Sequence, residues 1–145
     1  MSIHPAAVVS PQAIVHSGVE IGPFCVVEPG AVVGQNCRLF SGAVVKTGVT
    51  LGRDVTVCEG AVVGGGPQHL APPEPPGRVV VGERCTLREN VTVHRSMFTT
   101  GETRIGHDCY LMAGAHVAHD AKVGNHVILT NNVLLGGHVQ VGDRA

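Results

Sequence analysis

Aliphatic residues recur along this chain at every sixth position, and this period constrains the fold more than any other feature. The series is unbroken over residues 3–63, and it resumes over residues 81–141. Of its 24 positions, only His69, Pro75 and Thr99 are not aliphatic. An amphipathic helix would show a period near 3.6 residues and an isolated strand a period of two, so neither element explains the pattern.

A strict six-residue period with an aliphatic residue is typical of a parallel β-helix, in which three hexads form one triangular coil. The aliphatic residue points to the axis, polar residues face outward, and coils stack about 4.8 Å apart through parallel β hydrogen bonds. The sequence therefore predicts an all-β, single-stranded parallel β-helix, a hexapeptide-repeat solenoid. If every position of the series belonged to a coil, eight coils would form a prism about 38 Å long.

Two other places of the hexad support this geometry. The fifth place holds small residues, which indicates that space there is tight, and four of the five cysteines occupy it: Cys25, Cys37, Cys85 and Cys109. Because no CxxC pair is present, we interpret these thiols as small buried hydrophobic residues rather than metal ligands or redox groups. The fourth place often holds Gly, Asn or Asp, which tolerate the positive φ of a tight turn.

Two segments interrupt the series and are predicted to leave the wall of the prism as loops. Residues 65–77, GGPQHLAPPEPPG, contain five prolines, which cannot donate hydrogen bonds to a central ladder. Residues 96–103, SMFTTGET, lack the expected aliphatic residue at Thr99. Both interruptions keep the count divisible by six, so the sequence leaves open whether residues 64–80 form a degenerate coil or an excursion.

Composition limits the function. The chain is 43% hydrophobic but only 3% aromatic, which suits a thin core of small, equivalent layers. Its net charge is −1 and it has no run of Lys or Arg, so we expect no nucleic-acid partner. No apolar stretch reaches the roughly 20 residues of a membrane helix, and the first residues do not resemble a secretory signal. We therefore expect no membrane insertion and a cytoplasmic location.

Histidines gather in two late segments, AHVAHD and GGHV. One coil contains 18 residues, and His119 and His138 are 19 apart, so they should lie one coil apart and one residue along. His116 closes the preceding hexad, near the same corner. We therefore expect these three imidazoles on one outward edge, with Asp120 beside them. The remaining unclustered histidines are interpreted as solvated wall residues: His4, His16, His107 and His126.

The segments RENVTVHR, LMAGAHVAHD, VGN and NNVLLGGHV, with IGPFCVV upstream, resemble the bacterial UDP-N-acetylglucosamine O-acyltransferase family, which begins lipid A synthesis. The resemblance runs in order along essentially the whole chain. It implies a homotrimer of left-handed β-helices, with active sites in the clefts between subunits. It also implies transfer of an (R)-3-hydroxyacyl group from acyl carrier protein to the 3-hydroxyl of UDP-N-acetylglucosamine, without a metal or other cofactor.

The resemblance also implies roles for individual residues. His119 matches the general base, Asp120 the carboxylate that orients it, and Gly137 the backbone donor to the oxyanion. Neutral imidazole suits the removal of a proton from a poorly nucleophilic sugar hydroxyl, and backbone N–H groups suit stabilisation of the oxyanion. Four further residues match substrate-binding positions: Gln68, His94, His116 and His138.

Two departures from the family pattern are visible. After Gln68 the family usually has an acidic residue and then a lysine two further on, whereas this chain has His69, Leu70 and Ala71. The chain also stops in mid-hexad at VGDRA, where family members continue with further coils and a helical C-terminal domain. We therefore expect residues 1–145 to be one β-helix domain that is truncated, and an inactive β-helix fragment stays open as an alternative.

Other functions also stay open. Another hexapeptide acyltransferase or acetyltransferase, including the N-acyltransferase of the same pathway, would differ in its acyl donor. A trimeric hexapeptide carbonic anhydrase would need three histidines around zinc, but its pair five residues apart has no match, since His116 and His119 are three apart. A non-catalytic scaffold would not bind UDP-N-acetylglucosamine.

Overall fold

The computed structural model describes residues 1–145 as 21 short strands, all paired in parallel, in three sheets of seven strands each. The first sheet contains β1 (Ser2–Ile3), β4 (Glu20–Ile21), β7 (Arg38–Leu39), β10 (Thr56–Val57), β13 (Thr86–Leu87), β16 (Tyr110–Leu111) and β19 (Ile128–Leu129). The second contains β2 (Val8–Val9), β5 (Val26–Val27), β8 (Val44–Val45), β11 (Val62–Gly65), β14 (Thr92–His94), β17 (His116–Val117) and β20 (Leu134–Leu135). The third contains β3 (Ile14–Val15), β6 (Val32–Val33), β9 (Val49–Leu51), β12 (Arg78–Val81), β15 (Glu102–Ile105), β18 (Lys122–Val123) and β21 (Gln140–Val141).

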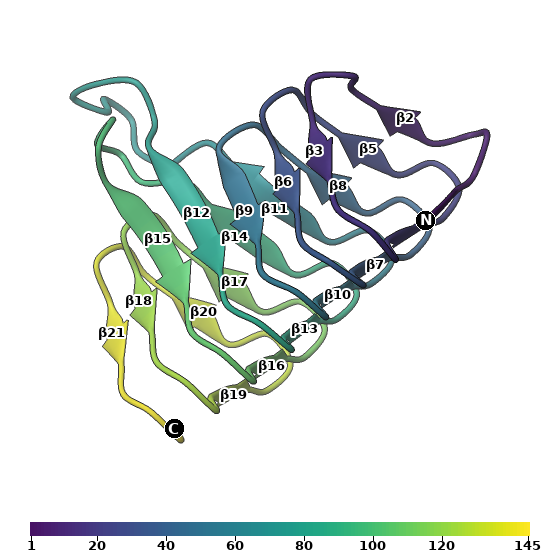
Figure 1. Cartoon of the computed structure of the whole chain (residues 1–145). Helices are drawn as coiled ribbons and strands as arrows, with labels where there is room; N and C mark the ends of the chain where they lie inside the picture. The colour runs from purple at the N-terminus through teal and green to yellow at the C-terminus, as the bar shows by residue number, and fades with distance from the viewer.

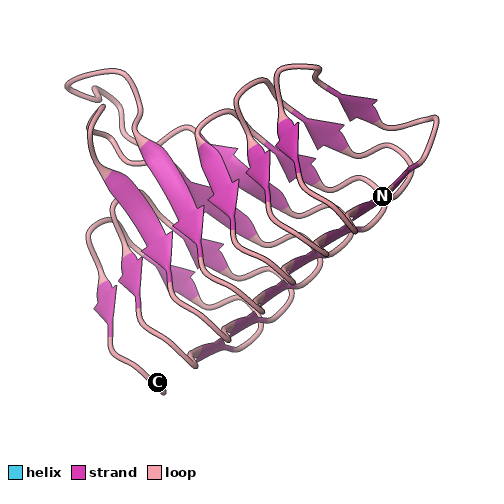
Figure 2. Cartoon of the chain, viewed as in Figure 1, coloured by secondary structure: helices cyan, strands magenta, loops and turns pink.

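The three sheets are the walls of a triangular prism, and the chain visits them in turn, so the predicted parallel β-helix is confirmed (Figure 1). Figure 2 shows strands and loops only. None of the elements is a helix that could cross a membrane.

The strand register separates the coils from the excursions. Ser2 pairs with Glu20, so an uninterrupted coil advances by 18 residues. Thr56 pairs with Thr86 and Thr86 pairs with Tyr110, so these two steps contain 12 and 6 additional residues. Residues 66–77, between β11 and β12, and residues 95–101, between β14 and β15, are therefore excursions.

The register also corrects the expected number of coils. The three positions of the series that lack an aliphatic residue, His69, Pro75 and Thr99, all fall within the excursions. Residues 64–80 thus do not form a degenerate coil, and the prism has seven coils, not eight. At about 4.8 Å per coil its length is about 34 Å.

The core is a column of aliphatic side chains along the axis. Leu51, Leu87, Ile105 and Leu111 are among its fully buried members. Burying a side chain of this size contributes about 1.5–3 kcal/mol, and the column repeats that gain in the inner coils, whereas the axial residues of the end coils are only partly buried. The prediction for the fifth place is confirmed, because four cysteines are buried there as free thiols: Cys25, Cys37, Cys85 and Cys109.

The corners use the fourth place of the hexad as predicted. Gly30, Asn36, Asp54 and Asn90 all have positive φ there, which turns the chain from one wall to the next. Asp120 has the same conformation, with φ of 63°. This residue is therefore a turn former as well as a member of the histidine cluster.

One edge of the prism carries both excursions and the clustered histidines. We call the edge between the second and third sheets the site edge. Both excursions leave from it, after β11 and β14, and the turns after β17 and β20 carry the AHVAHD and GGHV histidines. In Figure 1 this is the upper edge, where the teal loop projects.

Candidate active site

His119 and Asp120 lie in the turn that follows β17 on the site edge. The left-handed conformation of Asp120 lets its carboxylate approach the neighbouring ring, and His119 Nδ1 lies 3.0 Å from Asp120 Oδ2. Their side chains are only 12% and 10% exposed. A carboxylate partner places the proton of the neutral ring on Nδ1, so the Nε2 atom of His119 is left as the proton acceptor.

The carboxylate of Asp120 is held from the second excursion. The Ser96 hydroxyl donates to Oδ1, and the Met97 N–H donates to Oδ2 at 3.1 Å. The Asp120 N–H donates in turn to Thr103 Oγ1 at 2.8 Å. Burial alone would raise the pKa of Asp120, but the hydrogen bonds from Ser96, His119 and Met97 outweigh it and hold the pKa below its ordinary value. Asp120 is therefore ionised at neutral pH.

Gly137 leaves space for the His119 ring from the next coil. A Cβ at position 137 would lie 2.5 Å from Cε1 and 2.6 Å from Nε2 of His119. The Gly137 N–H makes no hydrogen bond within the chain. The same place of the hexad is proline in four other turns, which shows that the fold does not use this donor: Pro5, Pro11, Pro23 and Pro29.

His138 completes the group, as its spacing predicted. Its ring meets that of His119 edge to face, with the centroids 5.1 Å apart, and its Nε2 lies 4.0 Å from Asp120 Oδ2. The side chain is 57% exposed, and Phe98 of the second excursion lies beside it at 6.4 Å between ring centroids. The proximity predicted for His119 and His138 is therefore confirmed.

His116 lies on the wall of the second sheet and pairs with His94. Their rings meet edge to face with centroids 4.7 Å apart, and Thr92 Oγ1 lies 2.7 Å from His116 Nδ1. The three histidines predicted to share one edge are thus divided between two pairs. His119 and His138 form the pair on the edge itself, and His116 forms the wall pair with His94.

The two histidines of the wall pair, His94 and His116, both have lowered pKa values. Burial, together with the positive charges that His116 and His119 would carry, lowers the pKa of His94 from 6.5 to about 4. The buried Nδ1 of His94 has no hydrogen-bond partner within the chain. Burial also lowers the pKa of His116, against the opposing contact with Thr92. Both rings are therefore neutral at pH 7 and can act as hydrogen-bond donors or acceptors.

The first excursion places two neighbouring residues over the edge. Gln68 is exposed on it, and the ring of His69 stands edge-on to that of His119 with centroids 6.2 Å apart. His69 Nδ1 accepts from the Ala71 N–H at 3.2 Å, which leaves Nε2 free. In the sequence, His69 stands out only as a departure from a family pattern, so this contact was not predicted.

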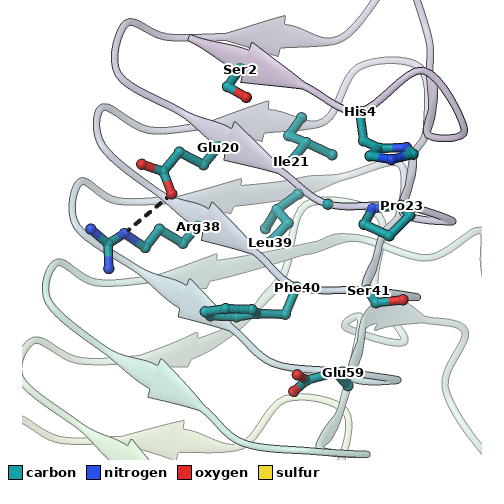
Figure 3. Close-up of a pocket in the computed structure, with 11 residues that line it drawn as sticks. Ser2, His4, Glu20, Ile21, Pro23, Arg38, Leu39, Phe40, Ser41 and Glu59 are labelled. Atoms are coloured by element: carbon teal, nitrogen blue, oxygen red, sulfur yellow. Dashed lines mark ion pairs between the residues drawn. The ribbon is translucent and has the colours of Figure 1, made fainter.

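Histidines and pockets elsewhere offer no comparable chemistry. His4, His16, His107 and His126 are exposed, which confirms their interpretation as wall residues. The chain's one pocket, about 490 Å³, lies on the first sheet near the N-terminus (Figure 3). Its Glu20 and Arg38 form an ion pair at 3.6 Å and it contains no base paired with a carboxylate, so we do not regard it as the active site.

A metal-binding role fits the donors less well. His119, Asp120 and His138 offer three potential ligand atoms that lie within 4.8 Å of one another. Zinc bonds of about 2.0–2.2 Å would require these atoms to close to roughly 3.4 Å. The Asp120 carboxylate is already engaged by Ser96, Met97 and His119. The arrangement therefore favours an oriented base.

The chain resembles known transferases in both sequence and structure. It matches the bacterial transferase hexapeptide (six repeats) family over residues 30–65 and 102–137. It is 51% identical over 144 residues to the acyl-[acyl-carrier-protein]–UDP-N-acetylglucosamine O-acyltransferase of Burkholderia lata, covering 99% of this chain and 55% of that protein. The corresponding Burkholderia mallei protein is 45% identical over 84 residues, 57% of this chain and 32% of the relative.

Solved structures agree with this likeness. The UDP-N-acetylglucosamine acyltransferase of Bacteroides fragilis superposes with a TM-score of 0.94 at 35% identity, covering 97% of this chain and 55% of that one. LpxA from Acinetobacter baumannii gives a TM-score of 0.93 at 34% identity, with the same coverage of 97% and 55%. These likenesses confirm the left-handed sense of the β-helix. The chain spans about half the length of the relatives it matches, or less.

Proposed function

The chain belongs, over its β-helix portion, to the UDP-N-acetylglucosamine O-acyltransferase family, and on that premise we propose that it transfers an acyl group to UDP-N-acetylglucosamine. The donor is an (R)-3-hydroxyacyl acyl carrier protein, and the acceptor is the 3-hydroxyl of the sugar. The observation that carries the proposal is the oriented base, His119 bonded through Nδ1 to Asp120, with its Nε2 open beside Gly137. We propose a cytoplasmic location for the reaction, since its donor would be a carrier protein.

The reaction follows from this geometry. The sugar hydroxyl approaches His119 Nε2, which takes its proton as the hydroxyl oxygen attacks the thioester carbonyl. The imidazolium that forms is stabilised by Asp120, which is already ionised. The free N–H of Gly137 is the candidate donor to the oxyanion of the tetrahedral intermediate. The imidazolium then returns its proton to the departing thiolate, so no covalent enzyme intermediate is required.

The remaining predicted residues are proposed to bind the sugar nucleotide. His138 is exposed beside the base, and the neutral His94 and His116 line the adjoining wall. Gln68 and His69 reach the same edge from the first excursion. A ligand seated there would contact the wall, the edge and the excursion together.

A second copy of the chain is proposed to complete the site, as part of a homotrimer. The histidines lie on an open edge rather than in a pocket, so one chain alone cannot enclose a substrate. The second sheet also presents four stacked valines to the outside as an apolar stripe, Val8, Val26, Val44 and Val62, and Leu134 lies in the same row beyond Thr92 and His116. Val8 is 65% exposed and Leu134 72% exposed. Such a contiguous apolar stripe is typical of a protein interface.

The test is an acyl-transfer assay with (R)-3-hydroxyacyl carrier protein and UDP-N-acetylglucosamine, in which the acylated sugar nucleotide is quantified. We expect product from the carrier-protein donor and none from the acetyl-CoA control. Product from acetyl-CoA alone would instead support another hexapeptide acetyltransferase. Failure to bind UDP-N-acetylglucosamine in a titration would support a non-catalytic β-helix.

A further inference from the structure

The second excursion contains a buried hydroxyl whose position is not explained by the β-helix. Ser96 and Thr103 are the only buried polar or charged residues of the chain, and both are fully shielded from solvent. Both hydroxyl groups bond to Asp120, Ser96 to its carboxylate and Thr103 to its N–H. Burying a hydroxyl is costly unless it is hydrogen-bonded. The burial of these two hydroxyls is therefore offset by their hydrogen bonds to Asp120, which fix the position of that residue.

The bonds of Ser96 fix the direction of its proton. Ser96 Oγ accepts from the Phe98 N–H at 3.0 Å, which is a local turn bond. The hydroxyl proton is then available for Asp120 Oδ1. Since the Met97 N–H and His119 occupy Oδ2, the two oxygens of the carboxylate are held by different partners. The carboxylate therefore has one preferred rotation, and this rotation presents Oδ2 to the His119 ring.

The two excursions hold Ser96 in place. The Gly77 N–H donates to the Ser96 carbonyl at 2.9 Å, and Arg95 donates to the carbonyls of Gly77 at 2.6 Å and Pro76 at 3.0 Å. Gly101 packs against the Ser96 side chain, and a Cβ at position 101 would collide with Ser96 Oγ. The end of the first excursion thus supports the beginning of the second.

We propose that Ser96 is a positioning residue for the base: its hydroxyl fixes the rotation of the Asp120 carboxylate and, through it, the tautomer and orientation of His119. The proposal rests on the proposed acyl-transfer function. The order of contacts is Ser–Asp–His, whereas a nucleophilic serine contacts the histidine directly. Ser96 is also buried behind the carboxylate, so it acts through Asp120 and does not touch the substrate.

Removing the hydroxyl should affect chemistry more than binding. In Ser96→Ala the carboxylate can rotate, and the His119 ring is held less well in the geometry that the proton transfer needs. Because small displacements of reacting groups are costly, we expect kcat to fall roughly 10–100-fold with KM unchanged. Ser96→Cys retains a weaker donor and should fall between Ser96→Ala and the wild type. The matched control is Ser10→Ala, since Ser10 Oγ makes the same local turn bond, to the Gln12 N–H at 3.1 Å, without a carboxylate partner.

The deciding measurement is NMR on the substrate-free protein. A ¹³C titration of Asp120 gives its carboxyl pKa, and ¹⁵N shifts give the tautomer of His119. We expect Ser96→Ala to raise the pKa of Asp120, because one of the bonds that lowers it is lost, and to mix the His119 tautomers. Ser10→Ala should change neither. An unchanged Asp120 titration and an unchanged His119 tautomer in folded Ser96→Ala and Ser96→Cys would overturn the proposal. Because these NMR signals need no substrate, they test the positioning role of Ser96 even if the proposed transfer reaction is not observed.

Discussion

His119 and Gly137 lie one coil apart, and the His119 ring fills the space that a side chain at position 137 would need. The β-helix makes this contact possible, because it stacks residues 18 apart and brings the turns after β17 and β20 together. The proposed base, His119, and the backbone of Gly137, which has no side chain, thus come from successive coils and form one site.

Replacing Gly137 by Ala should damage catalysis by displacing the base. The new Cβ would lie 2.5 Å from His119 Cε1, so the ring must move by about an ångström, and a shift of that size can cost on the order of 10²-fold in kcat. Gly136→Ala is the matched control, because a Cβ there meets no atom within 4 Å. Neither glycine has a positive φ, so backbone strain does not confuse the comparison. Equal kcat values for the two variants would contradict the proposed position of His119.

Acid should destabilise the protein through His94. Its pKa is about 4 in the folded chain against an ordinary 6.5, so between these values the unfolded chain binds more protons. The stability that the neutral ring provides is therefore complete above pH 6.5 and is lost as the pH falls towards 4. We expect a loss on the order of 1–3 kcal/mol, measured by chemical denaturation at pH 7 and pH 4.5. His94→Gln, which cannot titrate, should lose less stability over this range, and an identical loss in both proteins would refute the assignment.

A charge in the centre of the apolar stripe should prevent assembly. Val44 faces outward from β8, between Val26 and Val62, so Val44→Lys would bury an unpaired ammonium in the proposed contact without disturbing the core. Sedimentation should show a trimer for the wild type and a monomer for the variant, with weaker binding of UDP-N-acetylglucosamine. The control is Thr56→Lys, on the outer face of the first sheet beside Arg38 and Thr86. A trimer that survives Val44→Lys would place the interface elsewhere.

The repeat itself was predictable, because the aliphatic period records which side chain points to the axis in every coil. The same arithmetic predicted that His119 and His138 would meet, since both follow the excursions and no insertion separates them. The unpredicted contacts of Ser96 with Asp120 and of His69 with His119 both cross an insertion. Ser96 reaches Asp120 over 24 residues, which is one coil of 18 residues plus the six additional residues that the second excursion inserts.

The excursions limited the prediction for a physical reason. They insert 12 and 6 additional residues, both multiples of six, so the count alone could not separate a coil from a loop. The prolines of the first excursion could only argue against pairing. His69 lies on that excursion, whose path no periodic pattern determines. The aliphatic position lost at Thr99 was the available signal for Ser96: taken as a six-residue insertion, it places Ser96 next to Asp120 in the neighbouring coil.

The central claim is that His119 removes the proton from the sugar hydroxyl. Its most direct test is the kcat for acyl transfer from (R)-3-hydroxyacyl carrier protein to UDP-N-acetylglucosamine, measured for the wild type and for His119→Ala under saturating substrates. Loss of a general base should lower kcat by about 10²–10⁴-fold, while the melting temperature and the oligomeric state stay those of the wild type. Near-normal turnover by a folded His119→Ala protein would contradict the account.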